Sequence, residues 1–183
     1  TETNRMQALV RDLMSLSRIE AEKYDPPQTP VDFASIIMET VDHLRNSQKD
    51  RGADIAVDVT SDLPPVMGDV GQLRQLASNI LNNSMKYGHA GTPVSVSLTP
   101  SKSGAMINFA VTDVGDGIAP EHLPRLTERF YRVDSGRSRL VGGTGLGLSL
   151  VKHIVDRHRG HLEIRSILGK GTTVSILLPV AHS

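Results

Sequence analysis

The sequence predicts an α+β domain in which helices cover one face of a mixed, mostly antiparallel sheet, preceded by one long amphipathic helix. Segments with helical hydrophobic spacing and segments with strand character are mixed along the chain. The predicted strands come largely as hairpins, with Ser103-Gly104 in one turn and Gly169-Lys170-Gly171 in another. Hairpins join antiparallel neighbours, so they favour this sheet over a doubly wound parallel one.

Residues 1–22 are expected to form the first helix. Its apolar stripe, at three- and four-residue spacing, consists of Met6, Leu9, Val10, Leu13, Leu16 and Ser17. Nothing nearby in sequence covers this stripe, so we expect it to drive self-association or to lie against the main domain. The prolines at 26, 27 and 30 then mark a linker. We therefore divide the chain into a helix at 1–24, a linker at 25–30 and a main domain at 31–183.

The elements of the main domain follow from capping residues and hydrophobic period. One helix is predicted over 36–51 after Asp32, another from Asp69 to Tyr87, and a third over 146–159. Each is expected to end at a glycine, namely Gly52, Gly88 and Gly160. Strands are predicted at 55–59, 94–98, 106–112, 162–167 and 173–178.

Composition narrows the class of protein. The 183 residues are 38% hydrophobic and 22% charged, enough to bury the core of one domain with a short appendage. The 20 basic and 20 acidic residues leave no net charge to attract nucleic acid or an anionic membrane. The lack of cysteine rules out disulfides, thiolate zinc sites and cysteine nucleophiles. With no apolar run near the roughly 20 residues of a membrane span, we expect a cytoplasmic domain, and because the chain opens with Thr1 rather than Met we expect an excised fragment.

The helix after Asp69 has an apolar stripe that we expect to pack on the sheet, consisting of Leu73, Leu76, Ala77, Ile80 and Ser84. A second stripe beside it carries polar side chains. Asn79, Asn83 and Lys86 lie within about 60° of one another at 3.6 residues per turn. Amide oxygens are hard ligands and an ammonium neutralises phosphate, so the stripe suits a magnesium-bound polyphosphate. The alternative is a solvated polar face, although asparagine is a poor residue for the middle of a helix.

Two glycine-rich segments could contact a ligand. Asp113-Val114-Gly115-Asp116-Gly117-Ile118 comes directly off a strand, where Asp113 could accept a hydrogen bond from an adenine amine; the alternative is an ordinary Asp-Gly turn. The segment 142–148 opens a helix, where backbone N–H groups favour phosphate. It matches neither a Walker A loop nor the dinucleotide fingerprint. The arginine-rich loop between the two segments could reach phosphates through Arg132, Arg137 and Arg139, or each could be a solvated surface residue.

In combination, these segments resemble the ATP-binding boxes of bacterial sensor histidine kinases. Residues 79–87 (NILNNSMKY) resemble the N box, 113–118 (DVGDGI) the G1 box, 129–132 (RFYR) the F box and 143–148 (GTGLGL) the G2 box. Their order and spacing cover nearly all of residues 30–180. The resemblance implies a two-layer α/β sandwich of the Bergerat type, shared with gyrase, mismatch-repair ATPases and heat-shock chaperones.

The resemblance also implies roles for individual residues. Asn83 would bind Mg²⁺, Asn79, Lys86 and Arg132 would be catalytic, and Lys86 would also contact a phosphate. Tyr87 would lie near the ribose or phosphates, Asp113 would accept from the adenine amine, and Thr172 would support Asp113 through its hydroxyl. The adenine pocket would be shaped by Gly115, Gly117 and Ile118. The lid from Tyr131 to Thr144, which includes Arg137, Arg139 and Gly143, would close over the phosphates, with Gly145 and Gly147 at its hinge. Leu146 and Leu148 would also contact the nucleotide.

The function implied is a histidine kinase that presents the γ-phosphate of Mg-ATP to a histidine of a dimerisation hairpin, in cis or in trans. The full-length homodimer would then pass the phosphate to an aspartate of a response regulator, and would reach the inner membrane only through segments outside this chain. Residues 16–20 resemble the second hairpin helix. None of the seven histidines has a His-Glu-x-Arg-x-Pro context, so we expect no self-phosphorylation by this chain.

Two alternatives use the same fold. An ATP hydrolase of this superfamily places a glutamate at the position of Asn79, and an amide cannot take a proton from water at neutral pH. Asn79 therefore favours transfer over hydrolysis. The other alternative is a pseudokinase, a module that uses the nucleotide pocket for partner binding or as a scaffold.

Overall fold

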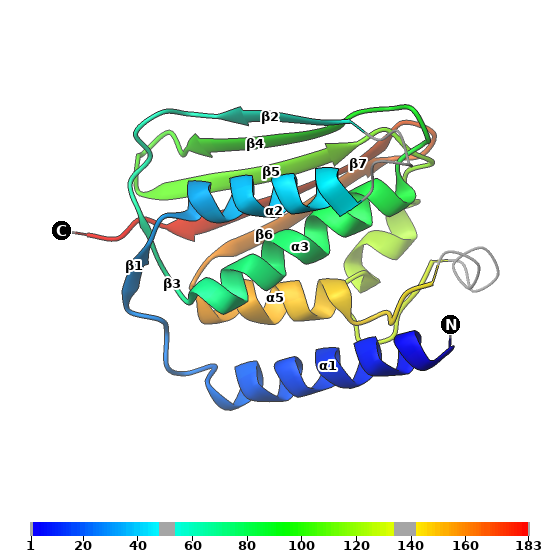
Figure 1. Ribbon diagram of the computed structural model, residues 1–183, viewed down its shortest axis with the longest axis horizontal. Coiled ribbons are helices and arrows are strands. Elements are labelled where there is room, and N and C mark those ends of the chain that lie inside the picture. The colour runs from blue at the N-terminus through cyan, green and yellow to red at the C-terminus, as the bar shows by residue number, and fades with distance from the viewer. Residues whose placement is uncertain (1, 48–53, 134–141, 183) are drawn as a thin grey trace.

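The protein is a five-stranded mixed sheet with helices on one face (Figure 1). A computed structural model describes residues 2–47, 54–133 and 142–182. The strand order is β2-β4-β5-β7-β6, and only β2 and β4 run parallel. The strands are β2 (Ile55–Val59), β4 (Val94–Pro100), β5 (Met106–Asp113), β6 (His161–Ile167) and β7 (Gly171–Pro179). The predicted mixed, mostly antiparallel sheet is confirmed.

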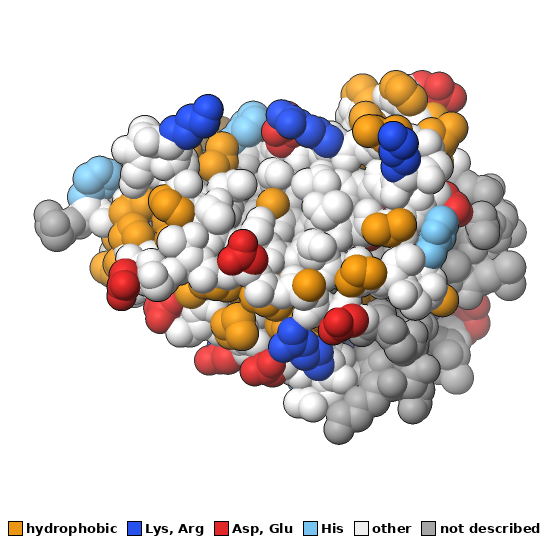
Figure 2. Space-filling model, turned by 90° about the horizontal axis from the view of Figure 1, so that it is seen from above, with side chains coloured by type: hydrophobic (Ala, Val, Ile, Leu, Met, Phe, Trp, Pro, Cys, Tyr) orange, Lys and Arg blue, Asp and Glu red, His pale blue; other side chains and the backbone are white. Residues whose placement is uncertain are grey.

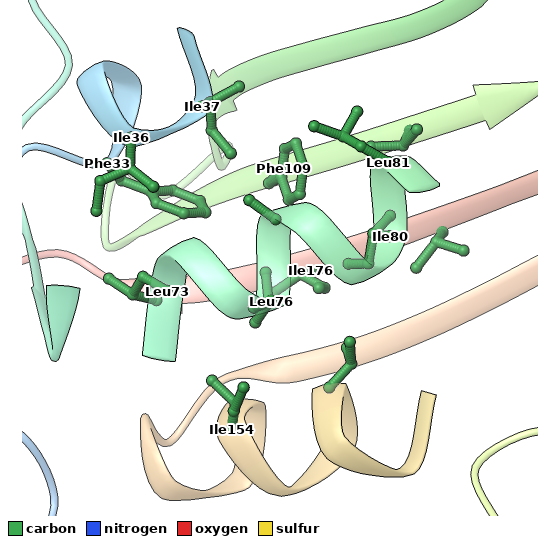
Figure 3. Close-up of a cluster of buried hydrophobic side chains, with 14 of the residues drawn as sticks. Phe33, Ile36, Ile37, Leu73, Leu76, Ile80, Leu81, Phe109, Ile154 and Ile176 are labelled. Atoms are coloured by element: carbon green, nitrogen blue, oxygen red, sulfur yellow. The ribbon is translucent and has the colours of Figure 1, made fainter. Parts of the chain in front are cut away.

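Three helices pack on the sheet and enclose the core. They are α2 (Phe33–Ser47), α3 (Val70–Tyr87) and α5 (Gly147–Arg157). Figure 3 shows the side chains of α2 and α3 meeting those of the strands, with Phe33 edge-on to Phe109 at a centroid distance of 5.6 Å. The predicted apolar stripe of α3 is fully buried, and it comprises Leu73, Leu76, Ala77, Ile80 and Ser84. This burial fixes the rotation of α3 and therefore which of its residues face α5.

Some boundaries and elements differ from the sequence prediction. The helix α2 begins at Phe33, because the Asp32 side chain already accepts the N–H of Ser35 at 3.1 Å. Its predicted end at 51–52 lies outside the described residues. A two-stranded sheet joins β1 (Thr29–Val31) to β3 (Val66–Gly68), so the end of the expected linker is paired. A 3₁₀ helix, η2 (Pro120–Arg125), occupies part of the long loop.

The first helix, α1 (Glu2–Ala21), packs along α5 (Figure 1). Leu16 and Ile19 are buried, whereas the stripe residues nearer the N-terminus, Met6, Val10 and Leu13, are exposed. The expectation that the helix lies against the main domain is confirmed for its C-terminal half. No helix in the described ranges combines the length and hydropathy needed to cross a membrane.

Polar contacts hold α1 at three places along its length. Asp12 accepts a hydrogen bond from the Thr144 hydroxyl at 2.9 Å, and Glu20 lies 3.2 Å from His153 Nε2. At the end of the helix, Glu22 pairs with the buried Arg157 at 3.1 Å. The face seen in Figure 2 intersperses basic, acidic and hydrophobic side chains, as expected for a chain of zero net charge.

Candidate functional site

The carboxylate of Asp113 lies at the end of β5 and is only 7% exposed. The register of β5 and β7 places it opposite Thr172, whose backbone N–H donates to Oδ1 at 3.3 Å. Burial raises the pKa of Asp113 to about 6, against the opposing effects of that N–H and of the charge of His89. A poorly solvated carboxylate of this kind favours a hydrogen-bond donor, such as an exocyclic amine.

Glycines let three segments close around Asp113. A Cβ at Gly115 would lie 2.5 Å from the carbonyl oxygen of Tyr87, at the end of α3. Gly117 has φ +69°, and its Cβ would lie 2.2 Å from the carbonyl oxygen of Ile167. Gly171 has φ +140°, with a Cβ position 2.0 Å from the backbone oxygen of Asp113. These positions require glycine for space, and two of them also for the sign of φ.

The support for Asp113 differs from the expectation for Thr172. The Thr172 hydroxyl is 2.8 Å from Ser166 Oγ rather than on the Asp113 carboxylate, which receives the Thr172 backbone N–H instead. The Ser166 hydroxyl donates to the Gly171 carbonyl at 2.9 Å and accepts the N–H of Ile118 at 2.8 Å. Since its one proton is used there, the Thr172 hydroxyl must donate to Ser166. Ser166, which sequence reasoning missed, thus ties the loop after β5 to β7.

The polar stripe of α3 faces the glycine segment that opens α5. Lys86 Nζ donates to the Gly142 carbonyl, and Arg132 Nη1 donates to the Gly143 carbonyl at 2.9 Å. Burial, with the Arg132 charge as a second cause, lowers the pKa of Lys86. A Cβ at Gly147 would lie 3.5 Å from Asn79 Oδ1. The structure therefore brings Asn79 and Lys86 to the expected phosphate segment, with the half-buried Asn83 between them on the same helix.

The start of α5 leaves its backbone donors available for an anion. Within the described part of the chain, no side chain caps this helix, whose first residue is Gly147. Leu146 is fully buried and anchors the turn, and Leu148 is half-buried. Gly145 has φ +73° and accepts the N–H of Phe130 at 2.9 Å, which joins the RFYR segment to the hinge. Unpaired N–H groups and the helix dipole favour phosphate here.

The remaining predicted residues lie near these two groups of residues or outside the described residues. Tyr87 is 51% exposed, with Lys86 Nζ 5.1 Å from its ring centroid. The Tyr131 hydroxyl lies 2.5 Å from His122 Nδ1, which ties the start of the expected lid to η2. The Thr144 hydroxyl donates to Asp12 of α1. Arg137 and Arg139 lie outside the described residues.

One contact beside Asp113 was not predicted. His89, just after α3, lies 2.8 Å from Asp116, which stands within the DVGDGI segment. Asp116 belongs to the DVGDGI segment, but no local pattern in the sequence predicted that His89, at the end of α3, would contact it.

Comparison with known protein families gives a match over most of this region. Residues 68–182 match the model of the family described as "Histidine kinase-, DNA gyrase B-, and HSP90-like ATPase". The chain is 39% identical over 175 residues to the phosphate regulon sensor protein PhoR of Pseudomonas aeruginosa, covering 94% of this chain and 38% of PhoR. It is 38% identical over 178 residues to the sensor-like histidine kinase SenX3 of Mycobacterium bovis, covering 97% of this chain and 43% of SenX3. It thus spans less than half of these relatives.

Solved structures give the same result at the level of the fold. The mycobacterial sensor histidine kinase MprB superposes with a TM-score of 0.73 at 30% identity, over 85% of this chain and 100% of that one. Full-length ShkA, solved in complex with AMPPNP, superposes with a TM-score of 0.83 at 27% identity, over 100% of this chain and 37% of that one. The superposition with ShkA thus includes α1 as well as the sandwich.

Proposed function

Since this chain belongs to the histidine kinase-, DNA gyrase B-, and HSP90-like ATPase family, as the ATP-binding catalytic domain of a sensor histidine kinase, we propose that it binds Mg-ATP between Asp113 and the start of α5. From there it presents the γ-phosphate to a histidine on a dimerisation hairpin. One observation carries this proposal. The buried, weakly solvated carboxylate of Asp113 lies beside the end of α3, and Lys86 of the same helix faces the cationic, donor-rich segment that opens α5.

The adenine end rests on Asp113. Its carboxylate accepts the exocyclic amine, in addition to the N–H of Thr172 that it already accepts. Gly115 and Gly117 let the loop after β5 pack closely on the end of α3 and on the end of β6, and Ile118, held by Ser166, borders the base. A buried, poorly solvated carboxyl with a raised pKa fits an adenine amine as its hydrogen-bond donor.

The phosphate end rests on α3 and α5. Lys86 and Arg132 already donate to the backbone carbonyls of Gly142 and Gly143, and they exchange these acceptors for phosphate oxygens. The N–H groups at Gly147 and beyond orient the phosphates. Asn83 offers an amide oxygen to Mg²⁺, which when bound neutralises phosphate charge. Asn79 takes no proton from water, so the site favours transfer to histidine over hydrolysis.

The proposed partners follow from α1. Met6, Val10, Leu13 and Met14 are exposed on it, and they suit the first helix of the hairpin or the second protomer of a homodimer. The acceptor histidine would stand on that first helix, outside this chain, and act in cis or in trans. The phosphate would then pass to an aspartate of a response regulator. The domain itself would be cytoplasmic, with any membrane anchor in other segments of the full protein.

Calorimetric titration with AMPPNP, with and without Mg²⁺, tests this proposal. Asp113→Asn is expected to weaken binding at least tenfold, because the charge-assisted hydrogen bond is lost. Asp58→Asn, on the exposed side of β2, is its control. Asn83→Ala is expected to remove the Mg²⁺ dependence, whereas Asn82→Ala leaves it intact, because Asn82 is exposed and bonds the Ser78 carbonyl of its own helix.

Two results would contradict the proposal. A folded chain that binds no nucleotide would leave the cleft as a scaffold, which is the pseudokinase alternative. Rapid phosphate release from bound ATP, without phosphotransfer to a separately supplied histidine hairpin, would favour the hydrolase instead.

A further inference from the structure

The face of α1 that packs along α5 (Figure 1) has a carboxylate in its middle. Leu16 and Ile19 of this face are each 2% exposed, and Leu9 and Asp12 precede them at the same three- and four-residue spacing. Asp12 is half-buried, at a position where this spacing calls for an apolar side chain. A polar group loses hydration there, so it needs a specific partner.

The partner of Asp12 is the segment that leads into α5. The Thr144 hydroxyl donates to Asp12 Oδ2 at 2.9 Å and accepts the N–H of Leu146 at 3.2 Å. Since its single proton is directed at Asp12, the orientation of this hydroxyl is fixed. The carboxylate therefore lies two hydrogen bonds from the backbone N–H of Leu146, at the end of α5 where the phosphates are proposed to bind.

The docking of α1 keeps this carboxylate in place. Leu16 and Ile19 are buried on one side of it, and Glu22, at the end of the helix, pairs at 3.1 Å with Arg157. The Arg157 side chain is only 8% exposed, and a buried charge that loses its partner is left uncompensated. Asp12 is thus held beside Thr144 for as long as α1 is docked.

The negative charge of Asp12 has no cationic partner in the part of the chain that the structure describes. Other acidic residues of this interface do have one, since Glu20 contacts Arg129 and Glu22 contacts Arg157. A phosphate at the start of α5 would therefore meet two opposing effects: the helix dipole attracts it, and the carboxylate of Asp12 repels it.

We propose that α1, when docked on α5, restrains nucleotide binding: the Asp12 carboxylate, held by Thr144, lies beside the proposed phosphate end and repels a polyphosphate. The inference rests on the proposed placement of the phosphates at the start of α5. Movement of α1 away from α5 withdraws this charge and strengthens binding without any change at Asp113. Because coupling between two equilibria is reciprocal, a bound polyphosphate in turn weakens the docking of α1.

The first test is calorimetric titration of the whole chain and of Asp12→Asn with ADP and with AMPPNP, in the presence of Mg²⁺. The asparagine oxygen still accepts the Thr144 hydroxyl, so the variant removes the charge and keeps the hydrogen bond. At about 50 mM salt, Asp12→Asn is expected to bind AMPPNP about threefold more tightly than wild type and ADP less than about twofold more tightly, since ADP carries less charge. At about 0.5 M salt both gains are expected to disappear, because salt screens the charge.

Asp25→Asn is the matched control. It removes the same charge from an exposed position beyond the other end of α1, and it is expected to bind both nucleotides as wild type does. Hydrogen exchange in α1 gives a second readout. AMPPNP is expected to speed this exchange by about threefold in wild type, the same factor by reciprocity, and to leave it unchanged in Asp12→Asn. A contact that only supports the fold would not respond to nucleotide in this way.

Two outcomes overturn the inference. One is an Asp12→Asn variant that binds AMPPNP no more tightly than wild type at low salt; the other is a gain that persists at high salt, which would indicate an altered structure rather than a lost charge. Asp113→Asn separates these from a failure of the proposed function. If it binds weakly while Asp12→Asn behaves as wild type, only the inference fails. If it binds both nucleotides as wild type does, or if folded wild type binds neither, the proposed function itself is wrong.

Discussion

Asp113→Asn is expected to stabilise the nucleotide-free domain while it weakens nucleotide binding. The folded-state pKa of this carboxyl is about 6, against 3.8 for the free side chain. Between these values the folded chain binds more protons than the unfolded chain, so the free energy of unfolding falls as the pH rises through that window. Above pH 6 the full penalty applies, and a difference of about two units corresponds to about 3 kcal/mol.

The Asp113→Asn variant is not expected to recover the whole of this penalty. Its Oδ1 still accepts the N–H of Thr172, but its amide protons enter a buried site at a cost of about 1 kcal/mol or more. We therefore expect a net gain of about 1–2 kcal/mol at pH 7.5, or about 3–6 °C in Tm for a domain of this size.

Thermal unfolding followed by circular dichroism, at pH 7.5 and pH 5 and without nucleotide, measures this gain. At pH 5 the folded wild-type carboxyl is largely protonated, so the gain is expected to shrink by about 1 kcal/mol. The exposed Asp58→Asn is the control, with no change expected at either pH. An Asp113→Asn variant that melts at or below the wild-type temperature at pH 7.5, or whose gain is the same at pH 5, would refute the reasoning.

Three further predictions concern other parts of the domain. Gly171→Ala is expected to lower the free energy of unfolding by about 1–3 kcal/mol and to weaken nucleotide binding, because its Cβ would lie 2.0 Å from the last carbonyl of β5. Gly169→Ala, at φ +79° with open space around the Cβ, is the control and is expected to cost about 1 kcal/mol with binding intact. Equal effects of the two variants would contradict the steric cause. Burial lowers the pKa of His158, so the free energy of unfolding of wild type is expected to fall more steeply below pH 6.5 than that of His158→Gln. Chemical denaturation at several pH values measures this, and a parallel pH dependence in the two proteins would argue against it. Glu20→Gln is expected to speed hydrogen exchange in α1 by less than about tenfold, since the partly exposed contacts of Glu20 with His153 and Arg129 together contribute about 1 kcal/mol. Glu2→Gln, at the exposed start of α1, is the control and is expected to leave exchange unchanged. Unchanged exchange in both variants would mean that Glu20 does not hold the helix.

Local patterns predicted the helix of the site well. The α3 helix begins after Asp69, whose side chain accepts the N–H of Gln72 at 3.0 Å, and its apolar stripe is buried as its spacing required. The placement of Asn79 and Lys86 against the start of α5 follows from that rotation. Gly88 does end α3, but its φ is −66°, so glycine is needed there for space beside the Ser84 carbonyl rather than for a left-handed turn.

Contacts between distant segments were not predictable from the same patterns. The pairing of β1 with β3 joins residues more than thirty positions apart, and prolines near β1 indicated only a linker. The direction of the Thr172 hydroxyl depends on Ser166, a neighbour across the β6–β7 pair that no motif marks. The bond from Thr144 to Asp12 likewise exists only because α1 packs on α5.

The pairing of β5 with β7 also governs when the site can form. Asp113 and Thr172, which face each other in that ladder, are 59 positions apart. Closing so long a loop loses chain entropy before the new contacts offset it, so this ladder forms late relative to α3 and the β4–β5 hairpin. A nascent chain that has reached only residue 160 would already contain α3 and that hairpin, but the proposed adenine site would be incomplete. A nucleotide that needs Asp113 and Thr172 together is therefore expected to bind after β7 has paired with β5, and to stabilise the finished domain by mass action.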